Sequence, residues 1–179
     1  MKNLELKSEY TESRALIIGI NGYKHASPLG YAVNDAQEFA ILLIERFNFI
    51  NKNVNLLIDE KATRDAIMQS YLSFATSDVK ANDRIVIFFA GHGHTQTGHR
   101  GEVGFLVPYD GSPADLSSLI RWDEFTRNTE LIPAKHILFI MDACYGGLAV
   151  TRALHLGSMR FLKDMMLRFA RQVLNCWKS

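Results

Sequence analysis

Short apolar runs rich in branched side chains recur along this chain and predict buried strands. They occupy residues 15–20, 54–58, 84–90 and 136–141. Between the runs the apolar residues change to helical spacing. One helix is expected from Asn34 to Phe47, another from an N-cap at Thr63 to about Phe74, and a third near residues 122–128. This alternation predicts an α/β fold with a mostly parallel central sheet flanked by helices.

Two of the predicted strands lead directly to a residue that can do chemistry. His92 follows the run at 84–90 and lies between Gly91 and Gly93, while Cys144 follows the run at 136–141 and precedes a pair of glycines. Sites in open parallel sheets form outside the carboxyl ends of the strands. The pattern therefore predicts that His92 and Cys144 belong to one site.

A cysteine at the end of an apolar run is usually a small core residue, so position alone does not make Cys144 reactive. The glycines that follow it favour a sharp turn that leaves the sulfur uncovered. Because a thiolate attacks far better than a thiol, we expect His92 to stabilise the Cys144 thiolate or to take its proton. His92 would later protonate the leaving amine. The backbone N–H groups of Gly93 and Cys144 are the expected oxyanion hole, and no metal is required.

Several motifs together resemble those of caspase-like cysteine peptidases, and the metacaspase and orthocaspase branch more than the animal caspases. The motifs are residues 14–23, residues 29–36, Gly91-His92-Gly93, Val107-Pro108-Tyr109-Asp110 and Asp142-Ala143-Cys144-Tyr145-Gly146-Gly147. Cys144 lies 52 positions after His92, close to the spacing of the caspase signature. The resemblance implies a caspase-like sandwich with Cys144 and His92 as its catalytic dyad. It also implies an N-terminal extension at residues 1–12 and a catalytic domain at residues 13–179.

The acid two residues before Cys144 bears on substrate choice, because the caspase signature has glutamine where this chain has Asp142. A carboxylate in the pocket for the residue before the cut repels aspartate and favours arginine or lysine. Similarity to metacaspases places Asp35 at the other wall of that pocket. Each acid also has a simpler interpretation, Asp142 as a turn acid bonded to the backbone and Asp35 as an acid at a helix N-terminus. We expect an endopeptidase that cleaves protein or peptide substrates after Arg or Lys.

The length and composition of the chain narrow the expected number of domains, the classes of partner and the cellular compartment. The 179 residues suit one domain, and 20 basic against 19 acidic residues give no reason to expect a nucleic-acid or membrane partner. No segment reads as a signal peptide or a membrane span, so a cytoplasmic location is expected. Two cysteines are too few for a disulfide framework, and a reducing compartment leaves Cys144 free to react.

Several other possibilities for the chemistry and for the completeness of the sheet stay open. His92, His94 and His99 lie close in sequence and raise the possibility of a histidine-ligated metallohydrolase. Calcium activation occurs in some metacaspases, although this chain shows no clear acidic cluster, and no cofactor is expected. Caspase-like sheets have strands after the nucleophile, and these look truncated here. A second chain would then supply the missing strands, or the domain would be a weak or inactive interaction module.

Overall fold

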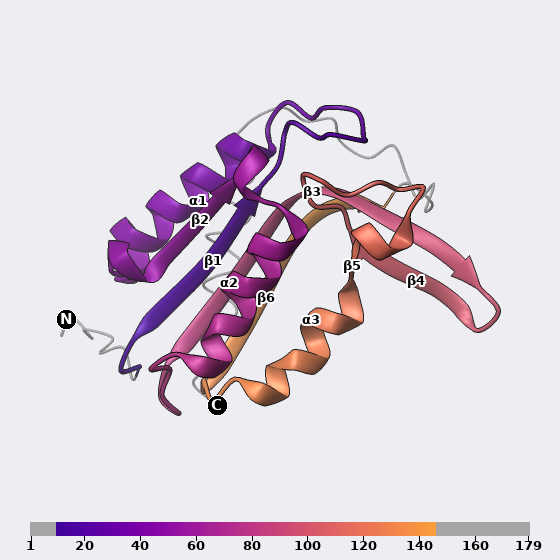
Figure 1. Cartoon of the computed structure of the whole chain (residues 1–179). Coiled ribbons are helices and arrows are strands. Elements are labelled where there is room, and N and C mark those ends of the chain that lie inside the picture. The colour runs from indigo at the N-terminus through magenta and orange to yellow at the C-terminus, as the bar shows by residue number, and fades with distance from the viewer. Residues whose placement is uncertain (1–9, 146–179) are drawn as a thin grey trace, which may run out of the picture. The chain divides into compact units, whose positions relative to one another are not determined.

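The computed structural model describes residues 10–145, and the strands and helices expected in this range are all present. The strands are β1 (Ser13–Gly19), β2 (Val54–Ile58), β3 (Arg84–Gly98), β4 (Gly101–Leu106), β5 (Ile120–Arg121) and β6 (His136–Tyr145). The helices are α1 (Ala32–Phe47), α2 (Arg64–Thr76) and α3 (Trp122–Asn128) (Figure 1). No helix in residues 10–145 is both long enough and apolar enough to cross a membrane.

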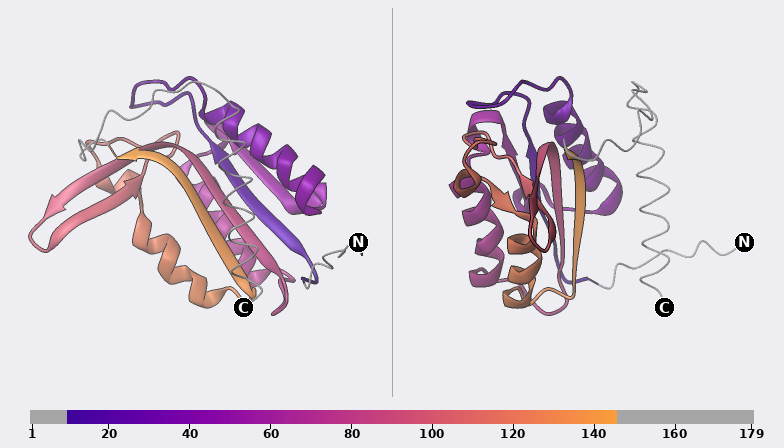
Figure 2. Two further views of the ribbon diagram at one scale, coloured as in Figure 1. Left: turned by 180° about the vertical axis from the view of Figure 1, so that it is seen from behind. Right: turned by 90° about the vertical axis from the view of Figure 1, so that its right-hand side faces the viewer.

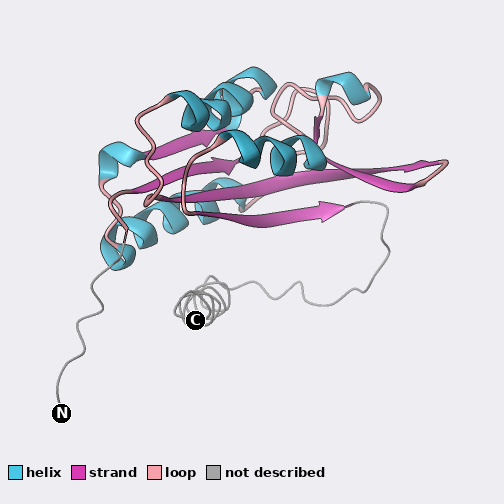
Figure 3. Cartoon of the chain, turned by 90° about the horizontal axis from the view of Figure 1, so that it is seen from below, coloured by secondary structure: helices cyan, strands magenta, loops and turns pink. Residues whose placement is uncertain are grey.

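The strands form one mixed sheet in the order β2-β1-β3-β4-β5, with β6 paired to β3. Strands β1, β2, β3 and β6 run parallel, which confirms the predicted sheet type. The expected end of the third strand at residue 90 is wrong. β3 continues to Gly98 because its polar second half pairs antiparallel with β4. Figure 3 shows this hairpin extending beyond the end of β6.

Buried polar contacts fix the register of β1 and β3 at the amino ends of the strands. Asp83 is fully buried, and its carboxylate accepts hydrogen bonds from the backbone N–H groups of Glu12 and Lys80. Next to it, the Arg84 guanidinium donates to Ser13 Oγ at 2.8 Å. A shift of one residue would turn every side chain of a strand to the other face, so this register decides which residues meet at the far end of the sheet.

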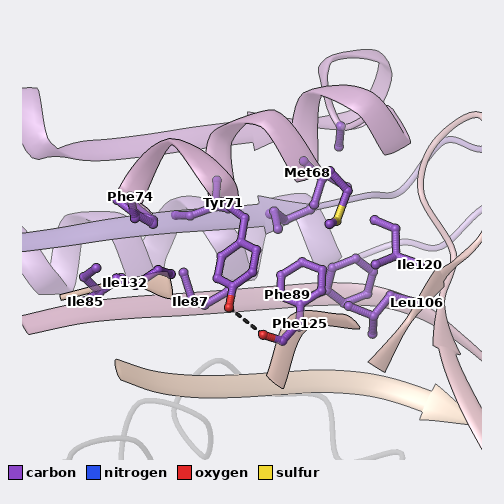
Figure 4. Close-up of a cluster of buried hydrophobic side chains, with 14 of the residues drawn as sticks. Met68, Tyr71, Phe74, Ile85, Ile87, Phe89, Leu106, Ile120, Phe125 and Ile132 are labelled. Atoms are coloured by element: carbon purple, nitrogen blue, oxygen red, sulfur yellow. Dashed lines mark hydrogen bonds between the residues drawn. The ribbon is translucent and has the colours of Figure 1, made fainter. Parts of the chain in front are cut away.

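Helices cover both faces of the sheet (Figure 2). On one face, α1 stacks Phe39 on Phe88 with ring centroids 4.6 Å apart. A Cβ atom at Gly19 would lie 2.5 Å from Ala36 Cβ, so this glycine allows α1 to approach β1 closely. On the other face, α2 and α3 enclose the main core, where Tyr71 stacks on Phe125 and donates its hydroxyl hydrogen to the Phe125 carbonyl (Figure 4).

Side-chain oxygens cap the helices that border the carboxyl end of the sheet. Thr63 is the N-cap of α2, as predicted, and its Oγ1 accepts from the Ala66 N–H at 3.2 Å. Helix α1 begins at Ala32, two residues before the expected start at Asn34. Asn21 explains this difference, because its Oδ1 accepts from the Val33 N–H at 3.3 Å, a contact between distant residues that helical periodicity does not show.

Candidate active site

The two residues proposed as a dyad occupy neighbouring positions in the sheet. In the parallel pairing of β3 with β6, the Cα partner of His92 is Cys144. Cys144 lies one residue before the end of β6, whereas His92 lies within β3, one residue before Gly93, which pairs with β6 on one edge and with β4 on the other. Because cross-strand partners in a sheet project to the same face, the register assigns both positions to one side of the sheet.

The imidazole of His92 is oriented by a backbone carbonyl. Its Nε2 lies 2.8 Å from the Ser27 carbonyl oxygen. A carbonyl oxygen can only accept, so the hydrogen-bond network assigns the proton to Nε2 and leaves Nδ1 with a free lone pair in the neutral ring. Ser27 precedes Pro28, and a proline disfavours the helical region for the residue before it, which restricts the directions this carbonyl can take. The sequence patterns gave no indication of the contact.

The loop that carries Ser27 follows β1 and is tied to the end of β2. Asp59 has a left-handed backbone conformation (φ 45°), and its Oδ1 accepts from the N–H groups of Asn21 and Gly22 at 2.8 and 2.9 Å. In the same loop, the Tyr23 hydroxyl accepts from the His92 N–H at 2.8 Å. Residues 19–22, which resemble an ordinary turn in the sequence, therefore belong to the support of the site.

The two predicted pocket acids lie on the same side of the sheet as His92. Gly19, Ala90 and Asp142 are successive cross-strand partners, and the Gly19 position faces Ala36 of α1. Asp35 lies in the first turn of that helix. Burial raises the pKa of the Asp35 carboxyl, and the charge of Asp142 raises it further. Desolvation by surrounding protein atoms also raises the pKa of Asp142, even though its side chain keeps contact with solvent. The fold thus brings the two carboxylates close enough to repel each other.

The raised pKa of Asp142 predicts a pH-dependent gain in stability for Asp142→Asn, because burial disfavours the ionised carboxylate and its charge also acts on Asp35. A carboxyl whose pKa is raised in the folded state stabilises that state below the unfolded value, ordinarily 3.8, and loses this contribution as the pH rises through the folded pKa. Asp142→Asn should therefore raise the urea midpoint at pH 7 and leave it unchanged below about pH 3.8. Glu38 is an exposed acid on α1, so Glu38→Gln serves as the control. Its effect on the urea midpoint should be the same at both pH values. An equal gain for Asp142→Asn at both pH values would show that the ionised carboxylate at position 142 is not the source of the instability.

The remaining candidates have local roles in residues 10–145. Asp110 Oδ1 accepts a hydrogen bond from the Arg64 backbone N–H at 2.9 Å. Asp115 Oδ1 accepts from the backbone N–H and the hydroxyl of Ser117, and Asp123 forms an ion pair with Arg121.

Within residues 10–145, no group of three or more His, Cys, Asp or Glu side chains is arranged to hold a metal ion. His94 lies on β3 opposite Phe105, with a buried Nε2 that has no hydrogen-bond partner. Gly93 is the Cα partner of Tyr145 on β6 and of Leu106 on β4.

Comparisons with known proteins agree with this architecture. Residues 12–170 match the family model described as the caspase domain. Metacaspase-6 of Arabidopsis thaliana is 31% identical over 146 residues, which cover 75% of this chain and 38% of the relative. Metacaspase-2 of Trypanosoma brucei brucei is 28% identical over 179 residues, which cover 86% of this chain and 51% of the relative. The chain thus spans about a third to a half of the length of these metacaspases.

A solved structure supports the fold independently. The crystal structure of protein GSU0716 from Geobacter sulfurreducens matches with a TM-score of 0.62 at 24% sequence identity, over 78% of this chain and 53% of that one. At this identity the match concerns the fold alone. The caspase-domain match, in contrast, covers most of the sequence, including His92, Cys144 and the two acids predicted to line a pocket, Asp35 and Asp142. The chain belongs to the caspase-domain family of cysteine peptidases and is similar to its metacaspase members.

Proposed function

We propose that this chain is a cysteine endopeptidase that cleaves protein or peptide substrates after Arg or Lys, with Cys144 as nucleophile and His92 as base. One observation carries the proposal: His92 is the Cα partner of Cys144, and its Nε2 is bound to the Ser27 carbonyl. With the proton on Nε2, the Nδ1 lone pair is the part of the ring that can accept the thiol proton.

In the proposed reaction, the Cys144 sulfur attacks the peptide carbonyl and the carbonyl oxygen becomes an oxyanion. His92 takes the thiol proton and gives it to the leaving amine, which produces an acyl-enzyme that water then hydrolyses. The N–H groups of Gly93 and Cys144 are the proposed donors to the oxyanion.

The direction of the backbone along β3 supports Gly93 in this role. The His92 N–H points to Tyr23, and the His92 carbonyl accepts from the Val107 N–H, both on the side of β3 away from β6. Because backbone groups alternate in direction along a strand, the Gly93 N–H points to the side of β6. The ladder continues to Gly93 and Tyr145, so this last pair must part before Gly93 can donate to an oxyanion.

The proposed specificity rests on Asp35 and Asp142. Two neighbouring carboxylates with raised pKa values are an unfavourable pair in the absence of a cation. A guanidinium or ammonium group between them would relieve the repulsion, and a guanidinium could bind a carboxylate in bidentate fashion. An aspartate side chain in the same place would add a third negative charge. The arrangement therefore favours a basic residue before the scissile bond.

Matched peptides that differ only at the residue before the scissile bond test this proposal. We expect cleavage after Arg and Lys, and cleavage after Asp slower by at least about a hundredfold, because repulsion replaces a charge-assisted pair. Faster cleavage after Asp would overturn the specificity. If no peptide is cleaved and Cys144 reacts with alkylating reagents no faster than Cys176, the chain would instead be a non-catalytic interaction module.

The pairing of β6 is relevant to a second chain that could add strands to the sheet. Among the described strands, β6 pairs only with β3, along one of its two edges, and the other edge is where a further strand would add. Strands supplied by a second chain, which we propose as one way to complete the sheet, would add to this edge. Sizing the purified protein by light scattering tests this idea: a dimer is expected if strands are exchanged between two copies.

A further inference from the structure

Tyr23 touches His92 in two ways. Its hydroxyl oxygen accepts the hydrogen bond from the His92 backbone N–H at 2.8 Å. Its ring lies against the imidazole, with centroids 4.8 Å apart and planes inclined by 41°. Tyr23 belongs to the loop after β1 and lies 69 residues before His92, so these contacts form only when the sheet has assembled. One side chain therefore contacts both the backbone and the ring of the proposed base.

Gly91 makes the approach of Tyr23 possible. A Cβ atom at position 91 would lie 2.6 Å from the Tyr23 hydroxyl oxygen and 3.0 Å from the Phe89 ring. Any residue other than glycine would therefore meet the phenol. The sequence suggested that this glycine keeps the imidazole accessible, whereas the structure shows a more specific use. The hydroxyl occupies the space that a side chain at position 91 would need.

The backbone on both sides of Tyr23 is anchored. Gly22 donates its N–H to Asp59, and the Lys24 N–H donates to the Tyr109 carbonyl at 3.0 Å. Burial, and to a lesser degree the charge of Asp59, raises the pKa of Tyr23 to about 12. The hydroxyl therefore stays neutral at physiological pH, and the phenol is held at a defined place.

From these contacts we propose that Tyr23 is a positioning residue for His92. Its hydroxyl holds the backbone at position 92, and its ring limits rotation of the imidazole, so that Nε2 remains on the Ser27 carbonyl and the Nδ1 lone pair stays free for the thiol proton. This inference rests on the proposed function, because positioning matters only if His92 is the base. Tyr23 itself takes no proton and touches no substrate in this role.

Tyr23→Phe keeps the ring but removes the acceptor, and nitrogen NMR of the His92 ring tests the result without any turnover. The measurement uses a Cys144→Ala protein, in which the His92 nitrogen signals are assigned by their disappearance in His92→Gln. These signals should show a single tautomer with the proton on Nε2. Adding Tyr23→Phe should move both nitrogen signals towards their average as the tautomers mix. The control is Tyr71→Phe, which removes another buried hydroxyl, bonded to Phe125, and should leave these signals in place. Unchanged His92 signals in folded Tyr23→Phe protein would overturn the proposal.

Kinetics provide the second readout. Tyr23→Phe should lower kcat about five- to tenfold with KM within about twofold, the effect of one lost hydrogen bond expressed on the base. Tyr71→Phe should change stability but not kcat. A loss confined to KM, or an equal loss of kcat in both variants, would show that Tyr23 has only a structural role.

Gly91→Ala tests the same contact from the opposite side, since its methyl group should displace the phenol. It should lower kcat by a similar factor, and it decides the matter if Tyr23→Phe does not fold. The double variant should lose less than the product of the two single losses, because both changes break one contact. A loss of kcat in the double variant equal to the product of the two single losses would contradict the proposal. If the parent protein cleaves no peptide, the proposed function fails, while the NMR result still decides whether Tyr23 positions the ring.

Discussion

Cys144→Ala is expected to lower kcat/KM for an arginine peptide by at least about a thousandfold, because the reaction loses the nucleophile proposed at the Cα partner of His92. His92→Ala should cause a loss of similar size, because the thiol would lack the group that takes its proton. The double variant should be little worse than either single variant, since the two residues act as one unit. Cleavage of peptides by purified variants checks all three expectations.

Cys176→Ala is the matched control, because it removes the other cysteine of the chain and should leave kcat/KM unchanged. Position 176 lies outside the described residues. Alkylation with iodoacetamide at neutral pH adds a readout that needs no substrate. Cys144 should react faster than Cys176, and His92→Ala should remove the difference. Equal, slow labelling of both cysteines in the parent protein would show that Cys144 is an ordinary thiol, and the peptidase proposal would fail.

Asp142→Asn is expected to lower kcat/KM for arginine peptides by about 10- to 150-fold, the range for one hydrogen bond to a charged group. Asparagine keeps the size of the side chain but loses the charge that pairs with a guanidinium. Asp35→Asn should have a comparable effect, and Glu38→Gln, an exposed acid on the same helix as Asp35, should have almost none. Comparison of Arg and Asp peptides with each variant checks whether the loss is specific to basic substrates.

The pH dependence of the same assay follows from the raised pKa values. Both carboxylates must be ionised to bind a cation, and each holds its proton to a higher pH than an ordinary carboxyl. KM for arginine peptides should therefore rise as the pH falls from neutral, and it should begin to rise at a higher pH than a carboxyl with a pKa of 3.8 would produce. A KM independent of pH in this range would separate the acids from substrate binding. Equal losses of kcat/KM on Arg and Asp peptides in Asp142→Asn would also separate the acids from substrate binding.

The sequence alone supports a large part of this description. Within residues 10–145, apolar runs and helical spacing located the parallel strands β1, β2, β3 and β6 and the helices α1, α2 and α3, because burial against a sheet imposes these local periods on the chain. The capping role of Thr63 was also predictable, since an N-cap depends on neighbouring residues. The hairpin half of β3 was missed. Its polar residues lack the apolar pattern of a buried strand, and its pairing with β4 depends on a second segment.

Local sequence patterns were enough to predict the α/β class and to locate His92 and Cys144 near the carboxyl ends of parallel strands. The residues that come close to them in the fold could not be predicted in this way. Ser27 and Tyr23 reach His92 across 65 and 69 residues, because β1 lies beside β3 and delivers its following loop to that end of the sheet. Asp35 comes near Asp142 because Gly19 allows α1 to pack closely on the same face. Local patterns record whether a residue is buried and with what period, but the partner of a hydrogen bond or a charge depends on strand order and register, which are properties of the assembled sheet.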